Sequence, residues 1–181
     1  MSTSTKINWN KLYIFLVDER YVPCDDKDSN TKLVNDTIVN LSKIPKENFI
    51  FPNTSLSISE CVSDYAKKLK ELFKKAGMCD IMTLGMGNDG HIASLFPPVG
   101  KEAYSDDVVI NTQTETMVIR ERMSVTMKVI KESAKQAIFL KGKEKGKVYN
   151  EMVNSKEQDV SRWPLLEVLK DEKLYVIAGG W

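Results

Sequence analysis

Four short, nearly continuous apolar runs alternate with segments of helical periodicity, and this alternation constrains the fold more than any other feature. Runs of this length are typical of strands that are buried on both faces of a sheet. Strands that alternate with helices favour parallel pairing, because each helix returns the chain to the same edge of the sheet. We therefore predict an α/β domain with an open, mostly parallel sheet and helices on both faces, of Rossmann-like type. The runs are LYIFLV (12–17), CDIMTLG (79–85), AIFLKG (137–142) and LYVIAGG (174–180).

The segments between these runs carry signals for helix ends. Ser57 and Glu60 have the S-x-x-E spacing of a capping box, and apolar residues at steps of three and four continue until Gly77. Residues 28–30 can cap an earlier helix that runs to about residue 42. Its expected inner face comprises Leu33, Val34, Ile38 and Leu41. We also expect strands over 49–51, 108–110 and 117–120, and helices over 124–134, 143–153 and 163–169.

Composition and charge exclude several classes of function. The chain has 181 residues and a net charge of +1 with its basic residues spread out, so we expect one domain over 1–181 and no binding to nucleic acid. It has no secretory leader pattern at its start and no apolar stretch near the ~20 residues of a membrane span. The three cysteines form no C-x-x-C pair, which argues against disulfides and structural zinc and favours a reducing, cytoplasmic location.

The stretch GMGNDGHIASLFPP (85–98) holds the only histidine, His91, and its glycines spell G-x-G-x-x-G. That pattern is typical of dinucleotide-binding loops, but such a loop must be followed by a long helix whose N-terminus holds the pyrophosphate. Here Pro97 and Pro98 follow Gly90 too closely, and Asp89 would oppose a phosphate. No G-K-[ST] follows, which excludes a Walker A loop.

The alternative interpretation is a turn that presents His91 for chemistry. The run 79–85 would deliver the loop to the carboxyl edge of the sheet, where ligands bind in open parallel sheets. Glycines allow tight turns, and their amides can receive a developing negative charge. A histidine titrates near neutrality and can take and return a proton. A purely structural histidine that caps the turn is the competing interpretation.

Cations follow several of the predicted strands. Arg20 lies in the DER segment with Asp18, and Arg122 and Lys145 also come after strands. Since carboxyl ends of parallel strands meet at one edge, these side chains together suggest an anionic, phosphorylated substrate. A single histidine gives no histidine-rich metal site, so we expect none. Ser94 lies near His91, but the chain has no G-x-S-x-G elbow.

Two segments together resemble the 6-phosphogluconolactonase family within the glucosamine-6-phosphate isomerase/6-phosphogluconolactonase superfamily. INWNKLYIFLVDERYVPCDDKDSN (7–30) is similar to the family's segment that ends in D-E-R, V-P and S-N, and GMGNDGHIASLFP (85–97) is similar to its G-x-D-G-H signature. RMSVT (122–126) and LKGKEK (140–145) are weaker matches. Glucosamine-6-phosphate deaminases share G-x-D-G-H but have D-E-Y, and they remain the alternative.

The resemblance implies a metal-free, cofactor-free enzyme that hydrolyses 6-phospho-D-glucono-1,5-lactone to 6-phosphogluconate in the oxidative pentose phosphate pathway. It implies that His91 is the general base, and that Asp89 and the loop from Gly87 to Gly90 shape the site. Arg20, Arg122 and Lys145 would bind the phosphate and polar groups of the substrate, with Asp18 beside them. In some parasites the family is fused to glucose-6-phosphate dehydrogenase, so fusion or association with that enzyme is a further expectation.

One departure from the family pattern bears on activity. Family members begin with about two more βα units, which include a G-G-[ST] loop, and this sequence has no such loop. We therefore expect an N-terminally shortened lactonase-like domain that lacks the N-terminal strands. The third alternative is an inactive remnant that acts as an interaction module through an exposed sheet edge.

Overall fold

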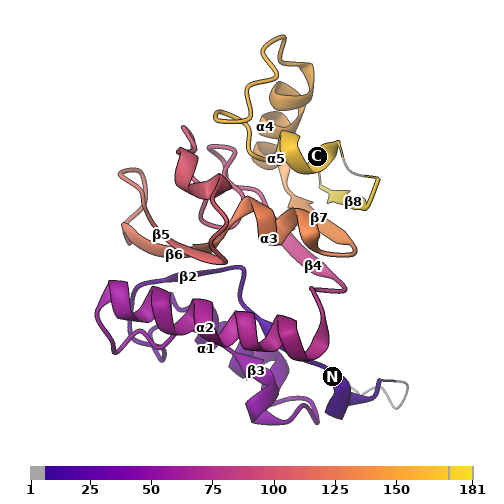
Figure 1. The fold of residues 1–181 in the computed structure, drawn as a ribbon. Helices are drawn as coiled ribbons and strands as arrows, with labels where there is room; N and C mark the ends of the chain where they lie inside the picture. The colour runs from indigo at the N-terminus through magenta and orange to yellow at the C-terminus, as the bar shows by residue number, and fades with distance from the viewer. Residues whose placement is uncertain (1–6, 171, 181) are drawn as a thin grey trace.

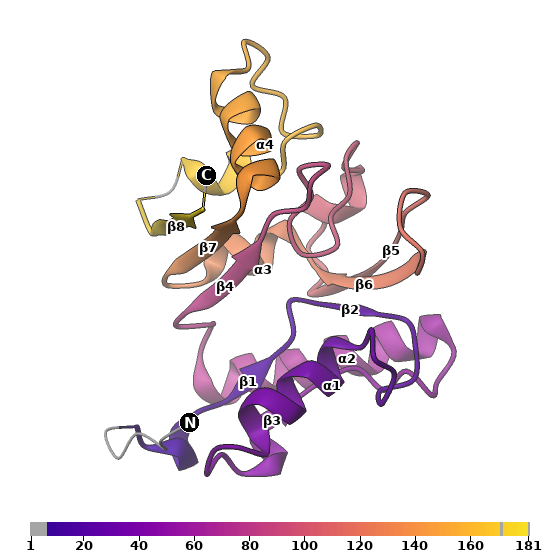
Figure 2. The same ribbon diagram turned by 180° about the vertical axis from the view of Figure 1, so that it is seen from behind.

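A computed structural model describes residues 7–170 and 172–180. Parallel strands with helices around them dominate the fold, as the sequence predicts. Figure 1 shows the N-terminal elements, with α1 and α2, below the C-terminal elements, which carry α4 and α5. The reversed view in Figure 2 brings α1 to the front and α2 to the back, so these two helices lie on opposite faces of β1 and β3.

Two groups of parallel strands form the α/β framework. β1 (Ile14–Phe15) pairs with β3 (Phe49–Ile50). In the second group β7 (Gln136–Lys141) lies between β4 (Met82–Gly85) and β8 (Leu174–Gly179), and the strands run parallel in the order β4-β7-β8. Four of these strands lie in the four apolar runs, and β3 coincides with the strand expected separately over 49–51.

A third group of strands is antiparallel. β6 (Glu121–Val125) pairs with β5 (Val109–Gln113) on one side and with β2 (Asp18–Arg20) on the other. The DER segment is therefore a strand, and residues 117–120, expected as a strand, belong to the β5–β6 turn. Ser124 lies within β6, and the next helix begins after Thr126 instead. Local apolar content located the first strand of this hairpin but not the second, because β6 is positioned by its pairing with the distant β2.

The longest helix, α2 (Ile58–Ala76), has the predicted ends. The capping box of Ser57 and Glu60 is formed, with the Ser57 amide donating to the Glu60 carboxylate over 3.2 Å. Gly77 ends the helix with φ of +84°, a conformation that glycine adopts without strain. Its buried residues are Cys61, Tyr65, Leu69 and Leu72.

The helix expected after residue 28 differs from its prediction. Ser29 is its N-cap and accepts from the Lys32 amide, but α1 (Asn30–Val34) is short and continues as a π-helical turn, η2 (Asn35–Val39). The predicted inner face is wrong in part, because Leu33, Ile38 and Leu41 are exposed. Thr31 and Val39 are the buried residues of this segment.

The remaining helices are short, apart from α4. They are η1 (Trp9–Lys11), η3 (Lys46–Asn48), η4 (Lys101–Tyr104), α3 (Met127–Glu132), α4 (Lys143–Asn154) and α5 (Leu165–Leu169). The main core packs α2 against β4, β6, β7 and the loop after β4, and it includes the fully buried Ile92 and Leu95 of that loop. Among the described residues, no helix is long and apolar enough to cross a membrane.

Candidate active site

The glycine loop after β4 folds into two consecutive tight turns. Met86 forms an antiparallel bridge with Ile92, and Ile92 forms another with Leu95. The Gly87 amide donates to the His91 carbonyl over 2.8 Å, and the Gly90 amide donates to the Gly87 carbonyl over 3.0 Å. No helix follows in residues 86–100, so the loop lacks the helix N-terminus that a dinucleotide-binding loop requires.

His91 forms a pair with Asp89 inside this loop. Its Nδ1 lies 2.5 Å from Oδ1 of Asp89, and its backbone amide donates to the same oxygen over 3.2 Å. Burial opposes ionisation of Asp89, but the hydrogen bond and charge of His91 lower the pKa of this carboxyl below its ordinary value. The carboxylate occupies Nδ1 and thereby leaves Nε2 as the nitrogen that can exchange a proton with a substrate.

Gly87 allows the imidazole to lie directly against the backbone. A Cβ at this position would lie 2.2 Å from Nδ1 of His91 and 2.5 Å from Oδ1 of Asp89. Gly90 has φ of +92°, and a Cβ there would lie 2.8 Å from the Trp163 ring. Close packing therefore requires both glycines, Gly87 against the His91–Asp89 pair and Gly90 against Trp163.

Phe96 connects the histidine to a cluster of cations. Its ring centroid lies 4.7 Å from that of His91, and the guanidinium carbon of Arg122 lies 5.9 Å from the same centroid on Phe96. Arg122 in turn is the direct register partner of Arg20 across the β2–β6 pair. Directly opposed residues of antiparallel strands share a face, so the two arginines are neighbours.

The arginine pair places two positive charges side by side, with Asp18, Glu19 and Asp28 also close enough to act on Arg122. Burial and the positive charge of Arg20 lower the pKa of Arg122 below its ordinary value. Arg20 donates through Nη1 to the Asp28 carbonyl over 2.6 Å, and Arg122 donates through Nε to the Ile119 carbonyl over 2.9 Å. Within the described residues, the buried Nε of Arg20 has no hydrogen-bond partner. Two opposed cations with an unused donor can be stabilised by a bound anion.

Asp18 ties this cluster to the glycine loop. Its Oδ2 accepts from the Ser94 hydroxyl over 2.7 Å, and the Ser94 amide donates to the Ser124 hydroxyl over 3.3 Å. Burial raises the pKa of Asp18, while the Ser94 hydrogen bond and the charge of Arg20 act to lower it. Asp18, Arg20 and the histidine loop therefore meet in one place.

Glu19 lies between Asp18 and Arg20 in the chain, but its carboxylate belongs to the start of α1. It is buried and accepts from the amide and hydroxyl of Thr31, each over 2.7 Å, and from the Asn30 amide over 2.8 Å. It anchors the start of α1 rather than the Arg20 guanidinium.

Lys145 lies at the same edge of the sheet but apart from this cluster. It is in the first turn of α4, which follows β7 through Gly142, and β7 is the neighbour of β4. None of the contacts observed among the described residues joins it to His91, Arg20 or Arg122. Metal ligands do not gather here or elsewhere in residues 7–170 and 172–180, where no group of three or more His, Cys, Asp or Glu side chains forms a metal site.

Four residues near the site were not assigned to it from sequence. Ser94 and Phe96 follow the histidine and make the contacts described above. Arg162 donates to the Asp89 carbonyl over 2.7 Å and stacks on Trp163 at 3.7 Å from its centroid. Ser94 and Phe96 lie in the same stretch as His91, and their sequence position could have assigned them to the site. The residues around 162–163 carry no local pattern that indicates a contact with Asp89.

Comparison with known proteins gives one consistent result. The family model of glucosamine-6-phosphate isomerases/6-phosphogluconolactonase matches residues 1–176. A protein from Dictyostelium discoideum named as a probable 6-phosphogluconolactonase is 38% identical over 172 residues, which are 93% of this chain and 72% of that relative. The chain covers 61% of a 6-phosphogluconolactonase from Thermotoga maritima and 54% of a probable one from rice.

Solved structures agree with the sequence relatives. A crystal structure of 6-phosphogluconolactonase from Thermotoga maritima superposes with a TM-score of 0.81 at 29% identity, over 98% of this chain and 76% of that one.

A further sequence relative joins two activities in its name. A Plasmodium falciparum protein named as a bifunctional glucose-6-phosphate 1-dehydrogenase/6-phosphogluconolactonase is 29% identical over 82% of this chain and 20% of its own length.

Proposed function

The chain belongs to the family of glucosamine-6-phosphate isomerases and 6-phosphogluconolactonases, and from that membership we propose that it hydrolyses 6-phospho-D-glucono-1,5-lactone to 6-phosphogluconate. The observation that carries the proposal is the connection of the His91–Asp89 pair, through Phe96, to the opposed Arg20 and Arg122. A proton-transfer group beside an anion site is what a phosphorylated ester substrate requires.

The proposed chemistry uses His91 as the base and then as the acid. Nε2 takes a proton from water as the water oxygen attacks the lactone carbonyl carbon. Asp89, held at 2.5 Å from Nδ1, stabilises the imidazolium that forms. The carbonyl oxygen becomes an oxyanion, and within the 87–90 loop the Asn88 amide is the candidate to receive it, because the Gly87 and Gly90 amides donate inside the loop. The tetrahedral centre then collapses, the bond to the ring oxygen breaks, and His91 returns its proton to that oxygen.

The phosphate would bind at the arginine pair. Arg20 has an unpartnered buried Nε, and its neighbour Arg122 is desolvated. A phosphate dianion between them would use donors that are otherwise idle and would offset the repulsion of the two cations. Lys145 would approach the substrate from the start of α4, where first-turn amides also favour an anion.

The decisive experiment measures lactone hydrolysis above its spontaneous rate. We expect the chain to accelerate hydrolysis, and His91→Ala to remove the acceleration while the circular dichroism spectrum is unchanged. His91→Asn is a closer variant in volume and gives the same expectation. An unaltered rate in both folded variants would contradict the role of His91, and absence of any acceleration by the parent chain would contradict the function.

A glucosamine-6-phosphate deaminase activity is the alternative, because the matching family also includes glucosamine-6-phosphate isomerases. The chain has DER at 18–20, where the deaminases that it resembles have D-E-Y. We therefore expect no ammonia release from glucosamine 6-phosphate under conditions in which the lactone is hydrolysed. Ammonia release with no lactone turnover would replace the proposed activity with the alternative.

We also propose that the chain acts in the cytoplasm, alongside a glucose-6-phosphate dehydrogenase. The Plasmodium falciparum relative, whose name joins both activities, supports the second part. The first part is supported by the three free thiols of this chain, Cys24, Cys61 and Cys79, which suit a reducing compartment. Affinity purification of the tagged chain, with dehydrogenase activity measured in the eluate, tests the association, and an inactive eluate would count against it.

A further inference from the structure

A turn before α5 is hydrogen-bonded to two points of the loop that carries the histidine. The turn comprises residues 159–163, between α4 and α5. Arg162 donates through Nη1 to the Asp89 carbonyl over 2.7 Å, and the Val99 amide donates to the Ser161 carbonyl over 2.8 Å. Figures 1 and 2 both show the segment before α5 beside the segment that leads from β4 to η4. The loop is therefore held from outside by a part of the chain that is distant in sequence.

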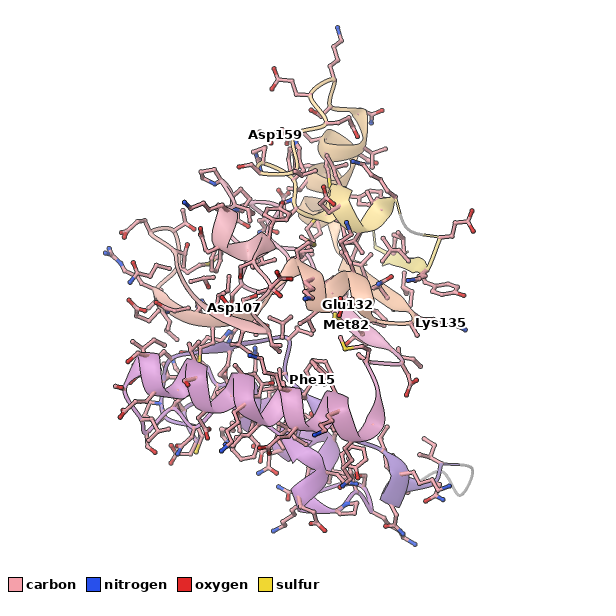
Figure 3. All side chains as sticks on the ribbon, viewed as in Figure 1. Phe15, Met82, Asp107, Glu132, Lys135 and Asp159 are labelled. Atoms are coloured by element: carbon pink, nitrogen blue, oxygen red, sulfur yellow. The ribbon has the colours of Figure 1, made fainter. Side chains whose placement is uncertain are left out.

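The turn is itself well braced. The Asp159 carboxylate accepts from the Ser161 amide over 2.8 Å, and the Asp159 carbonyl accepts from the Trp163 amide over 2.8 Å. Figure 3 labels Asp159 at the start of this turn. Trp163 is buried, and the guanidinium carbon of Arg162 lies 3.7 Å from its ring centroid. A planar guanidinium that stacks on a fixed ring is pre-organised, so it can hold its hydrogen-bond partner in one place.

The peptide group between Asp89 and Gly90 is fixed at both of its polar atoms. Its N–H is the Gly90 amide, which donates to the Gly87 carbonyl over 3.0 Å. Its carbonyl accepts from Arg162. Gly90 also packs against Trp163, since a Cβ there would lie 2.8 Å from the ring. Without Arg162, the bond inside the loop alone would hold the plane of this peptide.

This peptide is the joint between the carboxylate and the imidazole. Gly90 is the one residue between Asp89 and His91, and glycine has more backbone freedom than any other residue. Rotation at Gly90 would move Oδ1 of Asp89 away from Nδ1 of His91, from which it now lies 2.5 Å. Ala93, two residues further on, has φ of +49°, and a residue with a Cβ keeps such a conformation only where its surroundings impose it. The shape of the loop thus depends on contacts from outside it.

We infer that Arg162 is a positioning residue for His91: by holding the Asp89 carbonyl it locks the joint at Gly90 and keeps the carboxylate on Nδ1. Arg162 bonds a backbone carbonyl and not the carboxylate, so it acts on the geometry of the pair. The catalytic consequence rests on the lactone hydrolysis proposed above, whereas the locked geometry can be measured without any substrate.

The ring of His91 reports directly on this geometry, because it is the only histidine in the chain. Nuclear magnetic resonance of the chain labelled with nitrogen-15 in histidine, and purified without a histidine tag, would show one imidazole. In the parent chain we expect the neutral ring to carry its proton on Nδ1, where Asp89 accepts it. In Arg162→Ala the signals should shift toward those of Asp89→Ala, in which no carboxylate remains. A spectrum of Arg162→Ala identical to that of the parent would overturn the inference.

The kinetic test compares Arg162→Ala with Arg120→Ala, at an exposed arginine that pairs with Glu115. Because the base is misplaced while the substrate contacts remain, Arg162→Ala should lower kcat for the lactone about tenfold or more and change KM by less than about twofold. Arg120→Ala should change neither. A raised KM with kcat retained would overturn the inference, since Arg162 would then attract the anionic substrate by its charge.

A conservative variant and a stability measurement separate positioning from a merely structural role. Arg162→Lys can still donate to the carbonyl but lacks the flat group that stacks on Trp163, so it should recover part of the kcat lost in Arg162→Ala. A fall in kcat that only matches the loss of folded chain, measured by urea unfolding, would overturn the inference. If the parent chain does not hydrolyse the lactone, the proposed function fails, and the imidazole spectra alone decide the role of Arg162.

Discussion

Nδ1 of His91 lies 2.5 Å from Oδ1 of Asp89, a residue only two positions earlier in the same turn. A carboxylate at this distance fixes the ring orientation and the tautomer, so Nε2 is the nitrogen available as a base. We predict that Asp89→Asn lowers kcat for the lactone about 10²-fold or more while the fold is retained. An unchanged kcat would show that the pair is structural only.

The same pair predicts a dependence of stability on pH. The pKa of Asp89 is lowered in the folded chain, so its ionised carboxylate stabilises the fold above the unfolded pKa of about 3.9. That contribution is lost as pH falls through the lower, folded pKa. Asp89→Asn should therefore flatten the acid limb of a plot of unfolding free energy against pH. An acid limb as steep as that of the parent chain would refute this assignment.

Two glycines of one loop offer a matched comparison. Gly87→Ala would place a Cβ 2.2 Å from the His91 ring, so the ring must move. We predict a loss of activity of about 10²-fold, because a shift of about 1 Å in a catalytic group has this effect. Gly85→Ala meets nothing within 4 Å and should leave kcat nearly unchanged. Equal activity in the two variants would contradict the close approach.

The arginine pair can be tested in the same way. Arg20→Ala removes a half-buried cation whose buried Nε has no partner, and it should raise KM about 10-fold or more, with a smaller change in kcat. Arg120→Ala is the control, since this exposed arginine pairs only with Glu115 at the surface among the described contacts. A KM that rises equally in both would mean that general surface charge, rather than the pair, attracts the substrate.

Glu19 should act on stability. It accepts hydrogen bonds from Thr31, Asn30 and Ser29 at the start of α1, and Glu19→Ala leaves these buried donors without a partner. We predict a loss of about 3 kcal/mol in urea unfolding. Glu60→Ala removes an exposed carboxylate from the capping box of α2 and should cost clearly less. A loss at Glu19 no larger than this would contradict its anchoring role.

Local signals were sufficient for some elements. The ends of α2 follow from Ser57, Glu60 and Gly77, because a capping box and a glycine stop act within a few residues. The apolar runs also located β4, β7 and β8, although β8 is largely exposed in the structure and only β4 and β7 bury residues in the core. The position of His91 followed from the loop after one of these runs.

Other features depend on contacts between distant segments. Periodicity indicated that Leu33 and Leu41 face inward, but Glu19 holds the first turn of α1 so that Thr31 is buried and the two leucines are exposed. The pairing of Arg20 with Arg122 rests on an antiparallel register that no local pattern specifies. Arg162 reaches Asp89 across more than seventy residues of chain, which sequence spacing cannot indicate.

The hydrogen bond between Asp18 and Ser94 has a consequence for how this protein should be assayed. It joins the strand that carries Arg20 to the loop that carries His91, so the two halves of the candidate site belong to different halves of the chain. Any loosening between those halves would separate base from anion site before either half lost its helices. Turnover should consequently be a more sensitive gauge of domain integrity than far-ultraviolet circular dichroism.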